Sequence, residues 1–91
     1  MRLLLHPDAR AAIESLRDDP PNAELLSRVL RALNLVRTTP GSGEARREAW
    51  RTDDWGQVWA IPVQGPEDDW VVVWTLDEPD AVVVLYVGPA V

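Results

Sequence analysis

The order of apolar and polar residues predicts a strand followed by two helices in the N-terminal half of the chain. Arg2–Leu5 is a short apolar run, which favours a strand, and Pro7 suits the first turn of a helix because its φ is fixed near the helical value. A modest apolar stripe continues this helix to Asp18, just before two consecutive prolines. After Asn22, a predicted N-cap, apolar residues recur every three or four positions as far as Val36. Two helices separated by so short a break are expected to form an antiparallel hairpin.

The spacing of apolar residues changes to strict alternation in the C-terminal half, where Val and Trp predominate. Three segments are predicted as strands: Gln57–Val63, Trp70–Leu76 and Ala81–Val87. Their connectors are rich in Gly, Pro and acidic residues, which is typical of turns. Pro62 has no N–H for a ladder hydrogen bond, so it predicts an edge strand or a bulge. Glu44–Arg51 fits either a helical turn or an edge strand, and we favour strand or loop.

Together these elements predict an α+β fold with the order β-α-α-β-β-β, in which a helical hairpin packs on one face of a small antiparallel sheet. The chain of 91 residues is the size of one domain, which we expect to span residues 1–91. With no Cys and a single His, the sequence offers neither a disulfide nor a set of thiolate or imidazole metal ligands. We therefore expect an apolar core with no cofactor and no metal.

Charge divides the chain into two unequal halves. The net charge is −6, and all nine basic residues are Arg, the last being Arg51. Residues 52–91 carry eight acidic residues and no basic one, which argues against a nucleic-acid partner because phosphate binding requires Lys or Arg. An acidic surface that aids solubility and a surface for a basic protein remain as alternatives. No segment approaches the roughly 20 apolar residues of a membrane-spanning helix, so we expect a cytoplasmic protein without a membrane partner.

Few residues are of the types that carry chemistry. His6, the only histidine, directly precedes Pro7, where a capping or surface role is expected in place of catalysis. The three arginines Arg46, Arg47 and Arg51 form the one basic cluster, beside two tryptophans. Arg with aromatic side chains can hold single-stranded nucleic acid by charge and stacking, but four acidic residues interleave with this cluster. Surface ion pairs and contact with a protein therefore remain as alternatives.

The predicted sheet is apolar on both faces. Trp59 and Trp74 belong to the alternating sets expected under the helices. A half-exposed antiparallel sheet should carry polar residues on its other face, but this one does not, and an uncovered apolar face usually marks a partner surface. In the last strand, either Val82, Val84 and Tyr86 or the residues next to them could lie on this open face. As a separate alternative, Glu44–Asp54 could fold across the face and cover it. The residues predicted to bind a partner are Val58, Ala60, Val71, Val73, Thr75, Val82, Val84 and Tyr86.

Four segments in this order and spacing resemble the RelE/ParE superfamily of toxins from bacterial toxin–antitoxin pairs. They are LLLHPDARAAIESLR, AELLSRVLRALNLV, WGQVWAIPV and WVVVWTLDEPDAVVVLYVGP, which together cover nearly the whole chain. The most specific is the last, a hairpin of two Val-rich strands that flank an acidic turn and end in Val87 and Gly88. The resemblance implies the α+β fold predicted above.

RNA-cleaving members of this superfamily act on the ribosome and use basic residues to neutralise the charge that develops on the scissile phosphate. The resemblance places Lys and Arg on the open sheet face, an Arg after the last strand, and often a C-terminal Tyr or His. At the matching positions this sequence has Val71, the apolar stretch Val58–Pro62, and Pro89–Val91. Tyr86 lies inside the predicted last strand and does not match the terminal Tyr. The resemblance thus implies a divergent member that lacks the basic RNase site.

We therefore expect a protein without RNase chemistry that binds another protein through the apolar open face of its sheet. The partner is an antitoxin-like chain, which would add a helix or strand there, or a second copy in a homodimer. One alternative is an active toxin that cleaves ribosome-bound mRNA through Arg46, Arg47 or Arg51. Another is a gyrase-targeting ParE-type toxin, since those members also lack the RNase residues.

Overall fold

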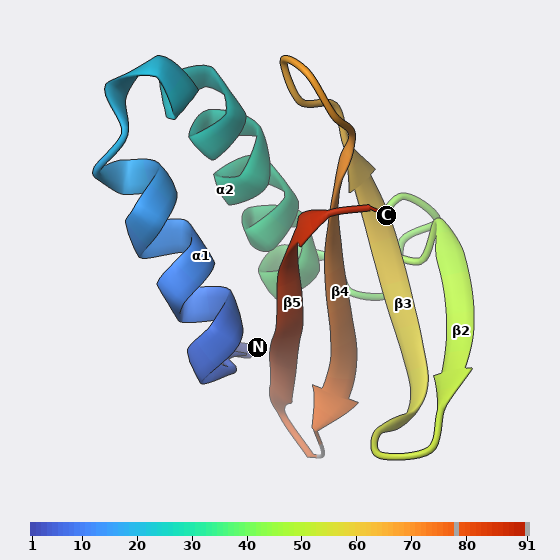
Figure 1. Cartoon of the computed structure of the whole chain (residues 1–91). Coiled ribbons are helices and arrows are strands. Elements are labelled where there is room, and N and C mark those ends of the chain that lie inside the picture. The colour runs from blue at the N-terminus through green and yellow to red at the C-terminus, as the bar shows by residue number, and fades with distance from the viewer. Residues whose placement is uncertain (78, 91) are drawn as a thin grey trace.

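The computed structural model describes residues 1–77 and 79–90 and confirms the α+β class and the helical hairpin (Figure 1). It adds one strand to the predicted order, because Glu48–Thr52 forms an edge strand, as favoured for this ambiguous segment. Glu78, in a predicted turn, and Val91 lie outside the described residues. The elements are β1 (Arg2–Leu5), α1 (Pro7–Arg17), a 3₁₀ turn (Pro20–Asn22), α2 (Ala23–Thr38), β2 (Glu48–Thr52), β3 (Gly56–Val63), β4 (Trp70–Asp77) and β5 (Ala81–Pro89).

The strands form one mixed sheet in the order β1-β5-β4-β3-β2. β1 runs parallel to β5, and the other neighbours are antiparallel. The connection between β1 and β5 contains the two helices and the three strands β2, β3 and β4. Both helices lie on the same face of the sheet (Figure 1). No helix in residues 1–77 and 79–90 is long and apolar enough to cross a membrane.

The two predicted helix N-caps differ in detail. His6 caps α1, and its Nδ1 accepts a hydrogen bond from the backbone N–H of Asp8 at 3.2 Å, which confirms its predicted capping role. Asn22 occupies the cap position of α2 but makes no capping hydrogen bond. Its Nδ2 instead donates to Asp19 at 2.7 Å and so links the cap residue to the connector between the helices.

The main core lies between the helices and the sheet, and Trp74 is the largest side chain fully buried in it. Its ring lies 4.9 Å from that of Trp59, measured between centroids, so both tryptophans face the helices as predicted. Its Nε1 donates to the carbonyl oxygen of Ala45 at 2.7 Å. Because Ala45 is also fully buried, the turn between α2 and β2 is fixed onto this core.

The end of β2 explains how the sheet tolerates Pro62. The pairing between β2 and β3 extends from Thr52 opposite Gly56 to Glu48 opposite Ala60. Pro62 lies two residues beyond that point, where the outer side of β3 has no neighbouring strand, so its missing N–H leaves no ladder hydrogen bond unmade there. Its prediction as an edge residue is confirmed for this part of the strand.

A β-bulge in the last hairpin corrects one prediction about which residues share a face. Val73 is opposite Tyr86, whereas the next residue, Trp74, is opposite Val84, so Leu85 is an extra residue in β5. The extra residue shifts the alternation. Val82 and Val84 consequently point toward the helices and belong to the main core, while Tyr86 lies on the other face with Val73. Their assignment to one common open face is wrong.

The sheet face turned away from the helices, here called the second face, is not uncovered. Val58, Ala60, Val71 and Val73 form a separate buried cluster there, with 0%, 0%, 6% and 8% of their surfaces exposed. Leu85, the bulge residue, packs against this cluster. The expectation of a large open apolar face is therefore wrong for the centre of the sheet.

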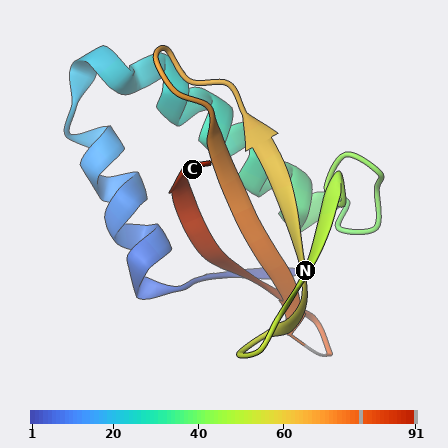
Figure 2. The same cartoon turned by 45° about the vertical axis from the view of Figure 1, so that its right-hand side comes forward.

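A ring contact links the two edges of the sheet. Trp55 lies in the turn between β2 and β3, and its ring meets the ring of His6 edge-on, with centroids 6.3 Å apart. His6 follows β1, and β1 and β2 are the opposite edges of the sheet. The sheet is therefore curled enough for its two edges to approach each other, and the strong twist of its strands is visible in Figure 2. The alternative in which Glu44–Asp54 folds across the face is wrong for Glu48–Thr52, because that part pairs with β3 as the edge strand of the same sheet.

Candidate functional site

The three clustered arginines do not converge on a common site. Arg46 lies over the ring of Trp59, 4.4 Å from its centroid, and its Nε donates to the carbonyl oxygen of Pro40 at 2.9 Å. It therefore holds the turn after α2 against the main core. Arg51 lies in β2 opposite Gln57, and Arg47 is exposed just before that strand. Among the described residues, none of the three contacts another through a hydrogen bond, and none is paired with a base.

Other groupings that carry chemistry are also missing from the part of the chain that the structure describes. It contains no group of three or more His, Asp or Glu side chains placed to hold a metal ion. His6 is engaged as the cap of α1 and against Trp55. His6 Nδ1 also lies 3.8 Å from a carboxylate oxygen of Asp8, but among the described residues no nucleophile is hydrogen-bonded to this pair.

The residues predicted to bind a partner lie in four different environments. Thr75 is 7% exposed, and its Oγ1 donates to the carbonyl oxygen of Gln57 at 2.7 Å, so its polar group is satisfied internally. Val82 and Val84 lie under the helices. Four others, Val58, Ala60, Val71 and Val73, belong to the second-face cluster. Of the predicted set only Tyr86, at 41%, is substantially exposed.

The exposed apolar side chains of the second face lie around the buried cluster and not at its centre. By register, Trp50 neighbours Val58 on β3, and Tyr86 neighbours Val73 on β4. Their exposed fractions are 44% and 41%. The Tyr86 hydroxyl donates to the carbonyl oxygen of Pro89 at 2.9 Å, and a Cβ at Gly88 would come within 2.6 Å of that hydroxyl. Gly88 thus provides the space in which this tyrosine lies.

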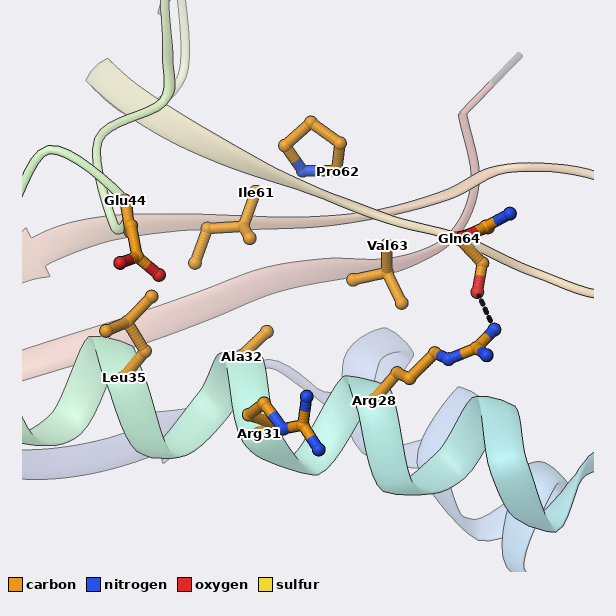
Figure 3. Close-up of a pocket in the computed structure, with 9 residues that line it drawn as sticks. All are labelled: Arg28, Arg31, Ala32, Leu35, Glu44, Ile61, Pro62, Val63 and Gln64. Carbon is orange, nitrogen blue, oxygen red and sulfur yellow. Dashed lines mark hydrogen bonds between the residues drawn. The ribbon is translucent and has the colours of Figure 1, made fainter.

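Sequence reasoning missed a groove between α2 and the free part of β3, with a volume of about 260 Å³. Figure 3 shows Ile61 and Val63 pointing from the strand toward α2, with Arg28 and Arg31 on the helix beside them. The groove lies where β2 has ended, so a free strand edge borders it. Its lining residues are Arg28, Arg31, Ala32, Leu35, Glu44, Ile61, Pro62, Val63 and Gln64.

The groove combines an apolar floor with charged side chains of both signs, Arg28 and Arg31 on α2 and Glu44 in the turn after it. The Arg28 guanidinium donates to the carbonyl oxygen of Gln64 at 2.9 Å and lies 3.4 Å from the Glu24 carboxylate, so it bridges α2 to the end of β3. Arg31 is exposed on the next turn of the helix. Two sequence signals could have indicated this groove: arginines three residues apart on a predicted helix, and a proline that ends strand pairing.

Comparison with known proteins agrees with the resemblance found in the sequence. The model of the family described as ParE toxin of type II toxin-antitoxin system, parDE, matches residues 3–90. Searches of curated proteins and of solved structures gave no match. Because the family match covers nearly the whole chain, and the α+β class is the one that the resemblance implied, this chain belongs to the ParE family of toxins from type II toxin–antitoxin systems.

Proposed function

We propose that this chain is an active toxin that acts on a protein target of the gyrase type and does not cleave RNA. The observation that carries the proposal is the burial of Val71 at the position where the resemblance places a basic RNase residue. A residue 6% exposed within an apolar cluster cannot meet a scissile phosphate, and its neighbours there are Val58, Ala60 and Val73. Membership of the toxin family favours retained toxicity over our earlier expectation of a binding protein alone.

The state of the arginines supports the same proposal. Arg46 would have to leave both the Trp59 ring and the Pro40 carbonyl to reach an RNA strand. Arg47 and Arg51 are exposed, and the described residues include no ion pair between either of them and a carboxylate. The acidic C-terminal half, with eight acidic residues and no basic one after Arg51, would also repel a phosphate backbone.

We further propose that the antitoxin of this pair, a ParD-type chain, binds in the groove between α2 and β3. Its floor offers apolar contacts through Ile61 and Val63, and Arg31 at the rim would pair with a carboxylate of the bound segment. The free edge of β3 beside the groove provides backbone groups to which an extended segment could bond. An amphipathic segment with acidic residues along one side fits these features best.

The test of the activity is induced expression in bacteria, with and without the neighbouring open reading frame. Growth, mRNA integrity and the supercoiling of a reporter plasmid are followed together. We expect growth arrest with intact mRNA and altered supercoiling, reversed by the neighbouring gene product. Arrest with cleaved mRNA would contradict the protein-target proposal, and Arg47→Ala and Arg51→Ala would then show which arginine is needed. Normal growth would contradict retained toxicity.

The groove is tested separately with Arg31→Glu and a charge-matched control, Arg10→Glu, on the exposed surface of α1. Arg31→Glu would place a carboxylate opposite the proposed carboxylate of the antitoxin. Because these like charges repel, the substitution should weaken binding of the antitoxin at least about tenfold. Arg10→Glu should leave binding unchanged, and neither substitution should alter toxicity in the absence of the antitoxin. Equal antitoxin affinity for the two variants would contradict this location.

A further inference from the structure

We propose that two copies of this chain pair through the outer edge of β2, in an antiparallel register centred on Trp50. The pairing would join the two five-stranded sheets into one continuous sheet across a two-fold axis. The inference concerns a surface separate from the α2–β3 groove and does not depend on the proposed toxin activity.

The first observation is that β2 is an exposed edge strand. It is the last strand of the sheet, and each of its five residues is exposed. Natural edge strands are usually shielded by short length, charged side chains, a proline, a bulge or a covering segment. β2 is short and carries the charges of Glu48 and Arg51, but it has neither lysine nor proline, and no irregularity interrupts its register with β3. The exposed row of backbone groups is therefore available to another strand.

A side-chain hydrogen bond shows which backbone groups of β2 point outward. The Nε2 of Gln57 donates to the carbonyl oxygens of Trp50, at 3.1 Å, and of Val58, at 3.0 Å. Trp50 and Val58 are directly opposite each other, so both carbonyls point into the space between β2 and β3. Since backbone direction alternates along a strand, the N–H and C=O groups of Ala49 and Arg51 point away from β3. These are the groups that a second strand would bond.

Charge selects one register. Facing residues of an antiparallel pair point to the same side of the sheet, and side chains alternate along each strand. In a symmetric pair, facing residues are therefore an even number of positions apart, and the two-fold axis passes beside one residue, which faces its own copy. With Trp50 at the centre, the outward-facing Ala49 of one copy lies opposite Arg51 of the second copy. Arg47 directly precedes β2, and Asp53 directly follows it as the first residue of the turn to β3. Pairing that continues one residue past each end of the strand therefore sets Arg47 of one copy opposite Asp53 of the second copy. The two tryptophans, each 44% exposed before pairing, face each other at the centre.

The neighbouring registers are unfavourable. Centring on Ala49 would place Arg47 opposite Arg51 twice. Centring on Arg51 would place that arginine opposite its own copy and Glu48 opposite Asp54. Like charges directly opposite each other destabilise a strand pair. The sequence around β2 thus favours a single self-complementary alignment. No lysine or proline in β2 prevents this pairing.

The interface is short, so the dimer is expected to be weak and to depend on protein concentration. Five strand residues from each copy bury less surface than the standard-sized interfaces that hold tight complexes. Two ion pairs and a central tryptophan pair provide specificity more than affinity. Sedimentation velocity of the full chain over a wide concentration range should show a reversible monomer–dimer equilibrium.

Charge reversal at the ends of β2 gives the decisive test. Arg47→Asp alone would set two pairs of acids against each other, and Asp53→Arg alone would set two pairs of arginines against each other. Each variant should dimerise at least about tenfold more weakly than the unaltered chain. An equimolar mixture of the two variants should restore dimerisation, because every facing pair then has opposite charges. Arg10→Asp, far from β2 on α1, serves as the matched control.

Circular dichroism of each variant shows whether it has kept its fold, and restoration in the mixture cannot arise from misfolded protein. The proposal is overturned if the unaltered chain stays monomeric at millimolar concentration. It is equally overturned if the single variants dimerise normally, or if folded variants do not associate on mixing.

Discussion

The two hydrophobic clusters of this molecule are built from the same strands but are closed in different ways. On one face, two helices cover a core that contains Trp74. On the second face, the cluster of Val58, Ala60, Val71 and Val73 has no helix above it, yet its members are at most 8% exposed. The difference shows that small apolar residues at the centre of a sheet can be buried without a helix packed on them.

Side-chain size explains why each method of closure suits its face. The second-face cluster contains only Val and Ala, whose short side chains let the two edges of the sheet approach until Trp55 reaches His6. A concave sheet brings its inward side chains closer together, so large residues there would force it open. The helix side instead accepts Trp59 and Trp74 because the helices can be spaced to fit them.

The largest effect is expected from Trp74→Ala, which would remove the main fully buried aromatic side chain of the helix side. The loss of packing against Trp59, with a cavity left behind, should lower the free energy of unfolding by about 3–5 kcal/mol, measured by urea denaturation. Trp74→Phe keeps most of the ring but removes the hydrogen bond to Ala45, and should cost about 1–3 kcal/mol. A loss below about 1 kcal/mol for Trp74→Ala would show that this core is not the principal one.

A pair of matched substitutions compares the two clusters directly. Val82→Ala on the helix side and Val58→Ala on the second face each remove the same atoms from a side chain that is 0% exposed. We expect a loss of about 2–3 kcal/mol for Val82→Ala and about 1–1.5 kcal/mol for Val58→Ala, since the cost depends on how well the site can collapse. Partly exposed neighbours such as Leu85 can move into the smaller cluster. Equal losses of unfolding free energy for the two substitutions would contradict the view that the second-face cluster can collapse around a missing side chain.

The elements with strong periodicity could be predicted from the sequence. Spacing of three and four residues defined the helix that ends near Val36, and alternation defined three strands close to their observed bounds. The roles of His6 as a cap and of Pro62 as an edge residue also followed from residue chemistry. In each case a local property of the chain was enough to determine the local structure.

What the sequence did not predict depends on long-range geometry. The bulge at Leu85 reverses the alternation, so Val82 and Val84 point the opposite way from the simple reading of the strand. The curl of the sheet and the groove beside Ile61 arise from where β2 stops and how far the sheet twists. No periodicity in the chain encodes either quantity, and the expectation of an open apolar face did not include them.

Trp55→Ala is expected to open the second face without unfolding the protein. The substitution removes the ring that joins the two edges of the sheet, so the amides of Val58 and Val73 should exchange with solvent about tenfold faster. Amides of the main core, such as that of Val84, should change far less. Leu30→Ala, which shortens a side chain 42% exposed on α2, is the control and should leave both sets unchanged. Uniform acceleration across both clusters would mean that the two faces open together.

The smallest effect is the coupling between His6 and Trp55, which tests whether their contact helps to hold the curl. His6→Ala also removes the cap of α1 and should cost about 1 kcal/mol for that reason alone, so the single substitution is not informative. His6→Asn keeps a capping group and removes the ring. A double-mutant cycle of His6→Asn with Trp55→Ala should give a coupling of about 0.5–1 kcal/mol, measured by urea denaturation. A coupling of zero would mean that strand twist and the packing of small residues close the second face unaided, and that the two rings meet only as a result.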